Sequence, residues 1–328
     1  MSRKTQPRRV LFYCIILVLS VVLLISGLRI LESTVLLKGH LPEATVKSKT
    51  ITVDGVDYFP RQDITVIMVL GIDEYGPVVA SESYNNTGEA DMVALLVFDN
   101  QNQTCDVLCL NRDTMVEMPV LGVGGKNAGT RYGQLALSHT YGSGLKDSCE
   151  NTKGAVSDFL GGITIDYYVA MNMDAISIIN DAVGGVTVNV TDDFSNVDPT
   201  ITKGEVTLKG QQAIHYVQTR KGVGDQKNIS RIERQKEYME AFLPAFRDEG
   251  EDEAFVLKTY QAVSPYMVTD CTAKTMTALV SRYGDFKLGE MISPEGENVM
   301  GEQYYEFHAD EEQLKSLIVD LFYAPKKK

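Results

Sequence analysis

One uncharged segment near the amino terminus constrains this chain more than any other feature. Residues 10–28 are a run of 19 residues without a charge, rich in Leu, Val and Ile. About 20 apolar residues are enough for a helix to cross the hydrocarbon core of a membrane. Basic residues beside a first span normally stay in the cytoplasm, and four precede this run: Arg3, Lys4, Arg8 and Arg9. We therefore expect a cytoplasmic tail at 1–9 and a transmembrane anchor at 10–30, in a single-pass protein of the cell membrane whose carboxyl-terminal part is extracytoplasmic.

A cleaved signal peptide is the competing interpretation of the same segment. The apolar region of a signal peptide is usually shorter and ends in a small-x-small site. Here the small pair Ser26-Gly27 is followed by Leu28 and more apolar sequence. This pattern favours an anchor.

The composition excludes two classes of protein. With 44% hydrophobic residues the chain can bury a substantial core, so it is not a disordered protein. The net charge of -13 argues against a nucleic-acid partner, because the phosphate backbone attracts basic surfaces. The four histidines are scattered and no CxxC motif occurs, so a zinc site is not expected.

Hydrophobic patterns predict an α/β domain. Residues 31–60 read as an extracytoplasmic stalk with a small hairpin, and 61–328 as the folded domain. Apolar runs at 65–70 and 92–98 are typical of strands buried on both faces, and 105–110 should pair with 92–98 as an antiparallel hairpin. Beyond this hairpin, predicted strands and helices alternate along the chain, which predicts a mixed central sheet flanked by helices. The expected helices lie at 135–139, 150–160, 174–183, 228–247 and 310–323, and the expected strands at 167–171 and 186–190.

Charged residues follow the ends of three predicted neighbouring strands. If these strands run up, down and up, one edge of the sheet brings together Asp73, Asp91 and the pair Arg112-Asp113. Paired carboxylates suit a hard cation such as Mg²⁺, and guanidinium groups match phosphate geometry. The alternative is that these carboxylates are turn or cap residues.

A second polar set lies late in the chain, around the start of the helix expected at 228–247. At 100° per residue, Arg231, Arg234 and Gln235 share one helix face. Arginines near a helix start oppose the macrodipole, and a bound anion would offset that cost. The two polar sets together would hold a metal pyrophosphate, whereas the simpler interpretation is a solvated helix face.

An ordered series of short motifs resembles the LytR-CpsA-Psr family over residues 64–247. No single motif is specific, but the order of the whole series is. It consists of Leu70-Gly71-Ile72-Asp73, Ala90-Asp91-Met92, Asn111-Arg112-Asp113-Thr114, Ile165-Asp166-Tyr167-Tyr168, Asp181-Ala182-Val183-Gly184-Gly185-Val186, Leu208-Lys209-Gly210-Gln211-Gln212-Ala213, Tyr216-Val217 with Arg220, Gly224-Asp225, and Arg231 with Arg234-Gln235.

The resemblance implies an αβα fold and a phosphotransferase that moves a glycopolymer from a polyprenyl-pyrophosphate carrier to peptidoglycan. It implies Mg²⁺ (or Mn²⁺) bound by Asp73 and Asp91, and a membrane lipid held in an apolar pocket under the sheet. Asp113 and Asp225 would act with Arg112 in catalysis, by orienting arginines or accepting a proton. The implied pyrophosphate-binding residues are Arg112, Arg220, Arg231 and Gln235. Arg234 and Gln218 lie beside them in the sequence and are further candidates for substrate binding.

Two residues depart from the family pattern. Glu89 and Gln218 stand where the family has arginines, which makes the local charge more negative. This change supports an alternative function, a non-catalytic protein that binds polyprenyl phosphates or wall polymers during assembly. His139 lies near another family loop and is either a proton acceptor or, as is commoner, a core or helix-surface histidine.

Overall fold

The computed structural model describes residues 50–325, apart from 54, 123–124, 220–221, 224–233, 235–236, 239, 243, 246–252 and 284–285. Its strands are β1 Ile51–Val53, β2 Val56–Pro60, β3 Ile64–Ile72, β4 Ala90–Asp99, β5 Thr104–Leu110, β6 Met115–Leu121, β7 Asn127–Gln134, β8 Tyr167–Asn172, β9 Val186–Val190, β10 Gly204–Leu208, β11 Met267–Thr269, β12 Lys287–Ile292, β13 Gly296–Met300, β14 Tyr305–Ala309 and β15 Tyr323–Pro325. Its helices are η3 Leu135–Thr140, α2 Lys146–Phe159, α3 Asp174–Ala182, α4 Gln211–Gln218, α6 Glu253–Val263, η4 Ser264–Tyr266, α7 Ala273–Tyr283 and α8 Glu311–Phe322.

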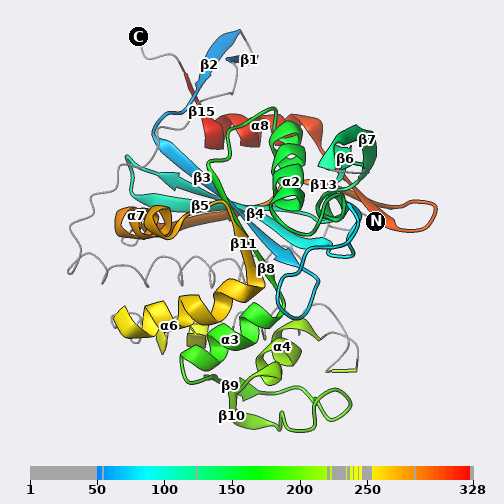
Figure 1. The fold of residues 1–328 in the computed structure, drawn as a ribbon. Helices are drawn as coiled ribbons and strands as arrows, with labels where there is room; N and C mark the ends of the chain where they lie inside the picture. The colour runs from blue at the N-terminus through cyan, green and yellow to red at the C-terminus, as the bar shows by residue number, and fades with distance from the viewer. Residues whose placement is uncertain are drawn as a thin grey trace, which may run out of the picture.

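A mixed six-stranded sheet lies at the centre, in the order β11-β8-β3-β4-β5-β12 (Figure 1). The strands β3, β4 and β5 are antiparallel neighbours, as the sequence predicts, whereas β8 runs parallel to β3 and β12 runs parallel to β5. Side chains of one strand point alternately to the two faces of the sheet. Because both faces are covered, β3 and β4 are apolar along nearly their whole length.

Helices cover both faces of this sheet. Val66, Met68 and Leu70 of β3 point into a core formed with α2 and α8. Ile67 and Val69 of the same strand point into the opposite core, formed with α3, α4 and α7. The αβα arrangement predicted from the sequence is therefore confirmed (Figure 1).

Most of the other predicted elements are present with shifted ends. The helix expected at 150–160 begins earlier, at Lys146, and the helical pattern at 135–139 is the 3-10 helix η3. Strands β8 and β9 and helix α3 match their predictions, and Asp310 caps α8 by accepting hydrogen bonds from the backbone of Glu312 and Gln313. The hairpin expected before residue 60 is β1–β2, which also pairs with β15.

Two predictions fall wholly or largely outside the described residues. The expected anchor at 10–30 is one of them, and most of the expected helix at 228–247 is the other. In the part of the chain that the structure describes, no helix has both the length and the apolar character needed to cross a membrane.

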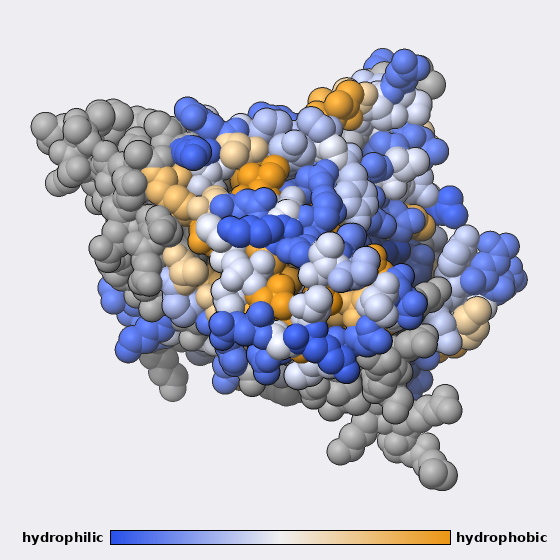
Figure 2. Space-filling view, turned by 90° about the horizontal axis from the view of Figure 1, so that it is seen from below, coloured by the Kyte–Doolittle hydropathy of each residue, from blue (hydrophilic) through white to orange (hydrophobic). Residues whose placement is uncertain are grey.

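The surface of the lower face is mainly hydrophilic, with separate hydrophobic patches among the polar residues near its middle (Figure 2). Inside, Cys105, Cys149 and Cys271 are buried free thiols. Cys105 and Cys109 lie four residues apart on β5, too far to bond to each other in an extended strand.

Asp99 at the end of β4 fixes the turn into β5. Its carboxylate accepts hydrogen bonds from the backbone N–H groups of Gln101 (2.8 Å) and Asn102 (2.9 Å) and from the guanidinium of Arg61 (2.7 Å). Burial alone would raise the pKa of Asp99, but the bonds from Arg61 and Asn102 outweigh it and lower the pKa to about 2. The turn therefore depends on an ionised carboxylate.

We predict that Asp99→Asn lowers the free energy of unfolding by about 1–2 kcal/mol at neutral pH. Because the folded pKa lies below the ordinary value of 3.8, this stabilisation is complete above that value and is lost as the pH falls toward 2. Urea unfolding at pH 7 and at pH 3 measures both effects. Asp320→Asn, at an exposed position of α8, is the control and should change stability little at either pH. An equal deficit for Asp99→Asn at both pH values would contradict the ionic origin.

Candidate active site at one edge of the sheet

The register of β3, β4 and β5 brings the predicted charged residues to one edge of the sheet. Ile72 at the end of β3 pairs with Ala90 at the start of β4, and Val93 of β4 pairs with Leu110 at the end of β5. The backbone N–H groups of Asp73 and Asp91 both donate to the carbonyl of Glu89, each at 3.0 Å. Asp73 and Asp91, 18 residues apart in sequence, and Arg112, a further 21 residues along, are therefore brought to the same edge.

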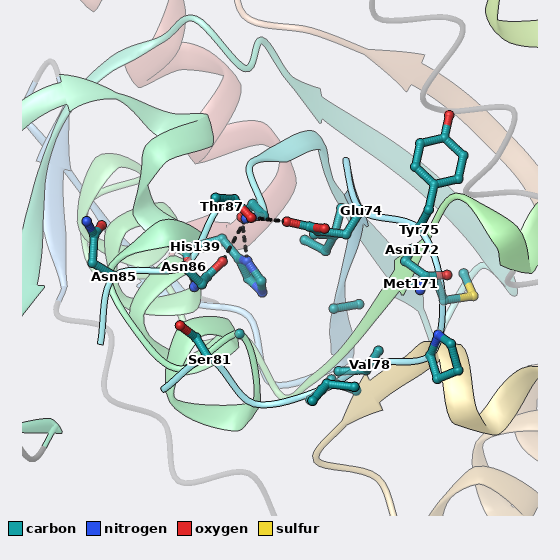
Figure 3. Close-up of a pocket in the computed structure, with 17 residues that line it drawn as sticks. Glu74, Tyr75, Val78, Ser81, Asn85, Asn86, Thr87, His139, Met171 and Asn172 are labelled. Carbon is teal, nitrogen blue, oxygen red and sulfur yellow. Dashed lines mark hydrogen bonds between the residues drawn. The ribbon is translucent and has the colours of Figure 1, made fainter. Parts of the chain in front are cut away.

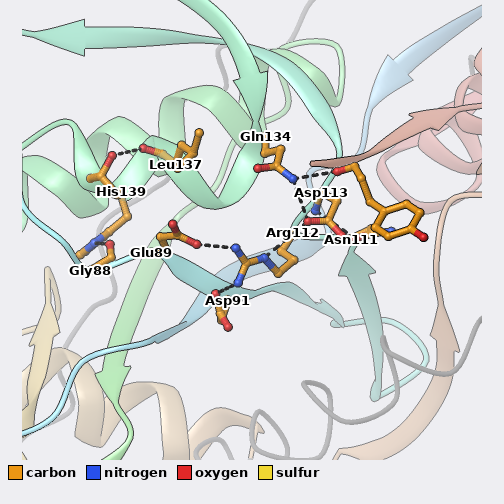
Figure 4. A network of polar contacts seen from close by, with 11 residues as sticks. Gly88, Glu89, Asp91, Asn111, Arg112, Asp113, Gln134, Leu137 and His139 are labelled. Atoms are coloured by element: carbon orange, nitrogen blue, oxygen red, sulfur yellow. Dashed lines mark hydrogen bonds and ion pairs between the residues drawn. The ribbon is translucent and has the colours of Figure 1, made fainter. Parts of the chain in front are cut away.

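Arg112 is the centre of this cluster (Figure 4). Its guanidinium forms ion pairs with the carboxylates of Glu89 and Asp91, and its Nε lies 3.6 Å from Oδ1 of Asp113. All three acidic partners come from the ends of β4 and β5. The guanidinium is therefore already neutralised by side chains of the protein.

A turn after β5 gives Arg112 its position. The side-chain Oδ1 of Asn111 accepts the backbone N–H of Asp113 at 3.0 Å, which is the Asx turn expected where Asn precedes a chain reversal. Gln134 at the end of β7 donates to Oδ1 of Asp113 at 3.0 Å and to the carbonyl of Tyr305 at 2.8 Å. The β13–β14 hairpin therefore supports the turn from outside the central sheet.

The edge carries an excess of negative charge. Burial, together with the nearby charges of Asp73 and Glu89, raises the pKa of Asp91 to about 6, against the lowering effect of Arg112. Burial works against the charge on Arg112, yet Asp91 and Glu89 outweigh it and raise the pKa of the guanidinium. Three carboxylates thus share one guanidinium, with the charge of Asp73 close by, and a further cation would relieve the repulsion among these four acidic groups.

The donor atoms fit a hard divalent cation. Asp73 and Asp91 offer carboxylate oxygens, which Mg²⁺ combines with phosphate oxygens and water rather than with a complete protein cage. Among the described residues, no group of three or more His, Cys, Asp or Glu side chains is arranged to hold a metal by itself. Two carboxylates would leave the other coordination positions of a metal free for phosphate oxygens and water.

Arg234, predicted as a ligand-binding residue, has a different environment. Its side chain is only 4% exposed and pairs with Asp192. Its Nε donates to the carbonyl of Tyr216 at 3.1 Å and its Nη2 to the carbonyl of Thr219 at 2.5 Å, while the guanidinium lies 5.3 Å from the centre of the Phe194 ring. Each guanidinium nitrogen thus has a protein acceptor. The two hydrogen bonds to backbone carbonyls hold the end of α4 in place.

The remaining predicted residues divide into two groups. Gln218, at the end of α4, is half-buried and accepts a hydrogen bond from the hydroxyl of Tyr75 at 3.3 Å, so it lies beside the segment that follows Asp73. Arg220, Asp225, Arg231 and Gln235 lie outside the described residues.

His139 is a core histidine. It is 2% exposed, its Nδ1 donates to the carbonyl of Gly88 at 2.8 Å, and its Nε2 lies 3.9 Å from Sγ of Cys149. Burial lowers the pKa of this imidazole and keeps it neutral. Instead of accepting a proton from a ligand, the ring holds Gly88, the residue before Glu89.

Sequence patterns did not identify Gln134 and Tyr305 as neighbours of the site. Both reach it from strands outside the central sheet, and nothing in their spacing signals the contact. The ion pair between Glu89 and Arg112 was indicated by one feature of the sequence, the acidic residue at position 89 where the family has an arginine.

Comparison with known proteins gives a consistent assignment. The model of the LytR_cpsA_psr family matches residues 37–321. The polyisoprenyl-teichoic acid–peptidoglycan teichoic acid transferase TagU of Bacillus licheniformis is 21% identical over 98% of this chain and 97% of its own length. TagU of Bacillus subtilis is 24% identical over 80% of this chain and 78% of that protein.

Solved structures share the fold. Bacillus subtilis TagV superposes with a TM-score of 0.57 at 24% identity, over 80% of this chain and 96% of TagV. TagT bound to LI-WTA gives a TM-score of 0.52 at 22% identity, over 79% of this chain and 89% of that one.

The environment of Arg234 predicts a structural role. Arg234→Gln should lower the free energy of unfolding by about 3 kcal/mol or more, because it leaves Asp192 without its partner and two carbonyls without donors. Chemical denaturation measures the loss. Arg131→Gln, on the exposed face of β7, is the matched control and should be close to neutral. An Arg234→Gln protein with wild-type stability but weakened pyrophosphate binding would instead make Arg234 a ligand.

Proposed function

The chain belongs to the LytR-CpsA-Psr family, and from that premise we propose that it transfers a glycopolymer from a polyprenyl-pyrophosphate carrier to peptidoglycan. The observation that carries the proposal is the convergence of Asp73, Asp91 and Arg112 on one sheet edge. The names of the TagU relatives, teichoic acid transferases acting between a polyisoprenyl carrier and peptidoglycan, agree with it.

The reaction is a substitution at phosphorus. A hydroxyl oxygen of the acceptor forms a bond to the phosphorus that carries the glycopolymer, and the bond from that phosphorus to the bridging pyrophosphate oxygen breaks. Polyprenyl phosphate leaves, and the hydroxyl proton passes to a base. Charge builds up on the phosphate oxygens in such a transition state, so the protein contributes mainly by neutralising charge and by positioning.

Each side chain of the edge has a proposed part. Asp73 and Asp91 would hold Mg²⁺ (or Mn²⁺), which when bound would neutralise the pyrophosphate. Arg112 would bind phosphate oxygens after exchanging its carboxylate partners, while Asp113, 8% exposed, keeps its Nε oriented. Asp225, the other predicted base, lies outside the described residues.

Location in the membrane forms part of the proposal. The carrier is a membrane lipid, and the expected anchor at 10–30 would hold the domain on the extracytoplasmic side, where peptidoglycan lies. An apolar pocket for the lipid is implied by the family resemblance.

A non-catalytic binding role remains the second candidate, and Glu89 favours it. This carboxylate is paired with the guanidinium that a pyrophosphate would require. A catalytic protein must therefore exchange Glu89 for phosphate in each cycle, whereas a regulated binding protein could use the same pair to keep its affinity low.

We predict that pyrophosphate binding requires a divalent metal. Asp73→Asn and Asp91→Asn should each weaken the affinity of the purified full chain for a short polyprenyl pyrophosphate about tenfold or more in Mg²⁺, a cost of about 1.4 kcal/mol. Titration calorimetry with Mg²⁺ and with a chelator measures this effect, with Asp320→Asn as the matched control. Equal binding in Mg²⁺ and in chelator, by all of these proteins, would rule out the metal-dependent transferase.

The charge at position 89 is open to a direct test. Glu89→Gln should tighten pyrophosphate binding about tenfold, and Glu89→Arg more, because each frees Arg112 from an ion pair and Glu89→Arg adds a cation. Glu117→Arg, a charge reversal at an exposed position of β6, is the control for net charge. Transfer assays on the same proteins separate the two functions: turnover by the wild-type chain establishes catalysis, and tight binding without turnover in every variant favours the binding protein.

A further inference from the structure

The turn after β5 is supported from outside the central sheet by the junction of β7 with η3 and by β14. The three carbonyls of this turn, at 112–114, each accept a backbone N–H from these elements. The donors, in that order, are the N–H groups of Ala136 at 3.0 Å, Phe307 at 2.8 Å and Leu135 at 2.8 Å. Backbone bonds thus hold the main chain of the turn, and a change of side chain leaves these bonds in place.

The orientation of the Asp113 carboxylate is a separate matter, because Arg112 does not fix it. Oδ1 of Asp113 lies 3.6 Å from Nε of Arg112, which is too long for a hydrogen bond. The attraction between the two charges therefore depends little on direction. Since the side chain of Asp113 is only 11% exposed, it needs hydrogen-bond donors to replace its lost hydration.

Gln134 supplies such a donor from the end of β7. One N–H of its side-chain amide donates to Oδ1 of Asp113 at 3.0 Å (Figure 4), and the other donates to the carbonyl of Tyr305 at 2.8 Å. Both partners are acceptors, so the amide faces them with its nitrogen. The two N–H bonds of a planar amide diverge at a fixed angle. The bond to β14 therefore restricts the direction in which Gln134 meets the carboxylate.

The oxygen that Gln134 holds is the one that faces Arg112. Glu89 and Asp91 pair with the other two nitrogens of the guanidinium, Nη2 and Nη1. In the proposed function these two partners give way to phosphate oxygens. The contact with Asp113 is then the one that keeps the guanidinium oriented during the exchange.

The support on the Glu89 side of the edge also belongs to a cavity. This cavity, of about 430 Å³, lies under residues 74–88, the segment that connects β3 to β4 (Figure 3). Gly88 and His139 both line it, so replacing His139 would change the cavity together with the position of Glu89. Gln134 is not one of the lining residues. A substitution at position 134 therefore tests the orientation of the guanidinium without altering the cavity.

We propose that Gln134 is a positioning residue for pyrophosphate binding, because it orients Asp113 so that Arg112 keeps its direction while its other carboxylate partners are exchanged for phosphate. The assignment rests on the proposed function for its ligand. Since separate backbone bonds hold the turn, the fold should survive the loss of this amide, whereas the affinity for phosphate should fall.

Three substitutions at position 134 separate the donor from the space that the side chain fills. Gln134→Met keeps the length without a donor, Gln134→Glu keeps the shape but turns a like charge toward Asp113, and Gln134→Lys restores a donor. Thr130→Glu and Thr130→Lys, at an exposed position on the same face of β7, control for net charge. Gln303→Met, in the exposed turn between β13 and β14, controls for the loss of an amide.

Titration calorimetry of the purified full chain with a short polyprenyl pyrophosphate in Mg²⁺ measures the effect. We expect Gln134→Met to weaken the affinity about tenfold, Gln134→Glu to weaken it further, and Gln134→Lys and the three controls to bind as wild type does. Recovery by lysine, which has a different shape, is not expected if the side chain only fills space. If Gln134→Met fails to fold, comparing Gln134→Lys with Gln134→Glu gives the same test. Wild-type affinity in Gln134→Met, or equally weak binding by Gln134→Lys and Gln134→Glu, would overturn the positioning role.

A signal that needs no ligand separates this inference from the proposed function. The Nε–H resonance of Arg112 in the isotope-labelled full chain reports on the surroundings of the guanidinium, and its loss in Arg112→Lys assigns it. Gln134→Met should shift this resonance, and Gln134→Lys should bring it back toward its wild-type position. If it shifts in this way but the wild-type chain binds no pyrophosphate, Gln134 orients Arg112 while the proposed function fails. If the wild-type chain binds pyrophosphate, but neither the resonance nor the affinity responds at position 134, the proposed function stands and the positioning role fails.

Discussion

The position of Arg112 among carboxylates is the constraint on which the rest of the site depends. One guanidinium holds the start of β4, through Glu89 and Asp91, against the turn after β5, through Asp113. The cluster exists because β3, β4 and β5 are antiparallel neighbours, since only that register brings the three chain segments to one edge. Every proposed phosphate or metal contact among the described residues starts from this geometry.

The same cluster makes ligand binding an exchange of partners. Removing one partner of a half-buried ion pair leaves a desolvated charge, so a ligand of Arg112 would have to replace the charge of Glu89 and Asp91. In the proposed function, a pyrophosphate would supply anions to Arg112, and a divalent cation would supply positive charge to Asp91. Pyrophosphate alone would leave Asp91 without a cation, and the metal alone would leave Arg112 without an anion. The binding of pyrophosphate and of the metal should therefore be coupled.

Sequence patterns predicted the sheet and this edge because both depend on local features. The apolar runs at 65–70 and 92–98 are typical of buried strands, and Asp73, Asp91 and Arg112 flank such runs. Helix periodicity placed Arg234 on a polar face with Arg231, but it carries no information on the acceptors at Asp192, Tyr216 and Thr219 that surround the side chain. The cavity under 74–88 was missed since that segment has no periodicity, and its shape follows from long-range bonds such as that between Val78 and Pro265.

The segment from Asp73 to Glu89 links the charged edge to the cavity, and Gly88 fixes the link. A Cβ at Gly88 would lie 2.9 Å from Cγ2 of Ile72 and 3.1 Å from Cγ of Glu74, so only glycine lets the segment pack this closely on the end of β3. The carbonyl of the same residue is held by the buried His139. Because Gly88 is fixed on both sides, the position of the next residue, Glu89, and with it the ion pair to Arg112, depends on the packing of this segment.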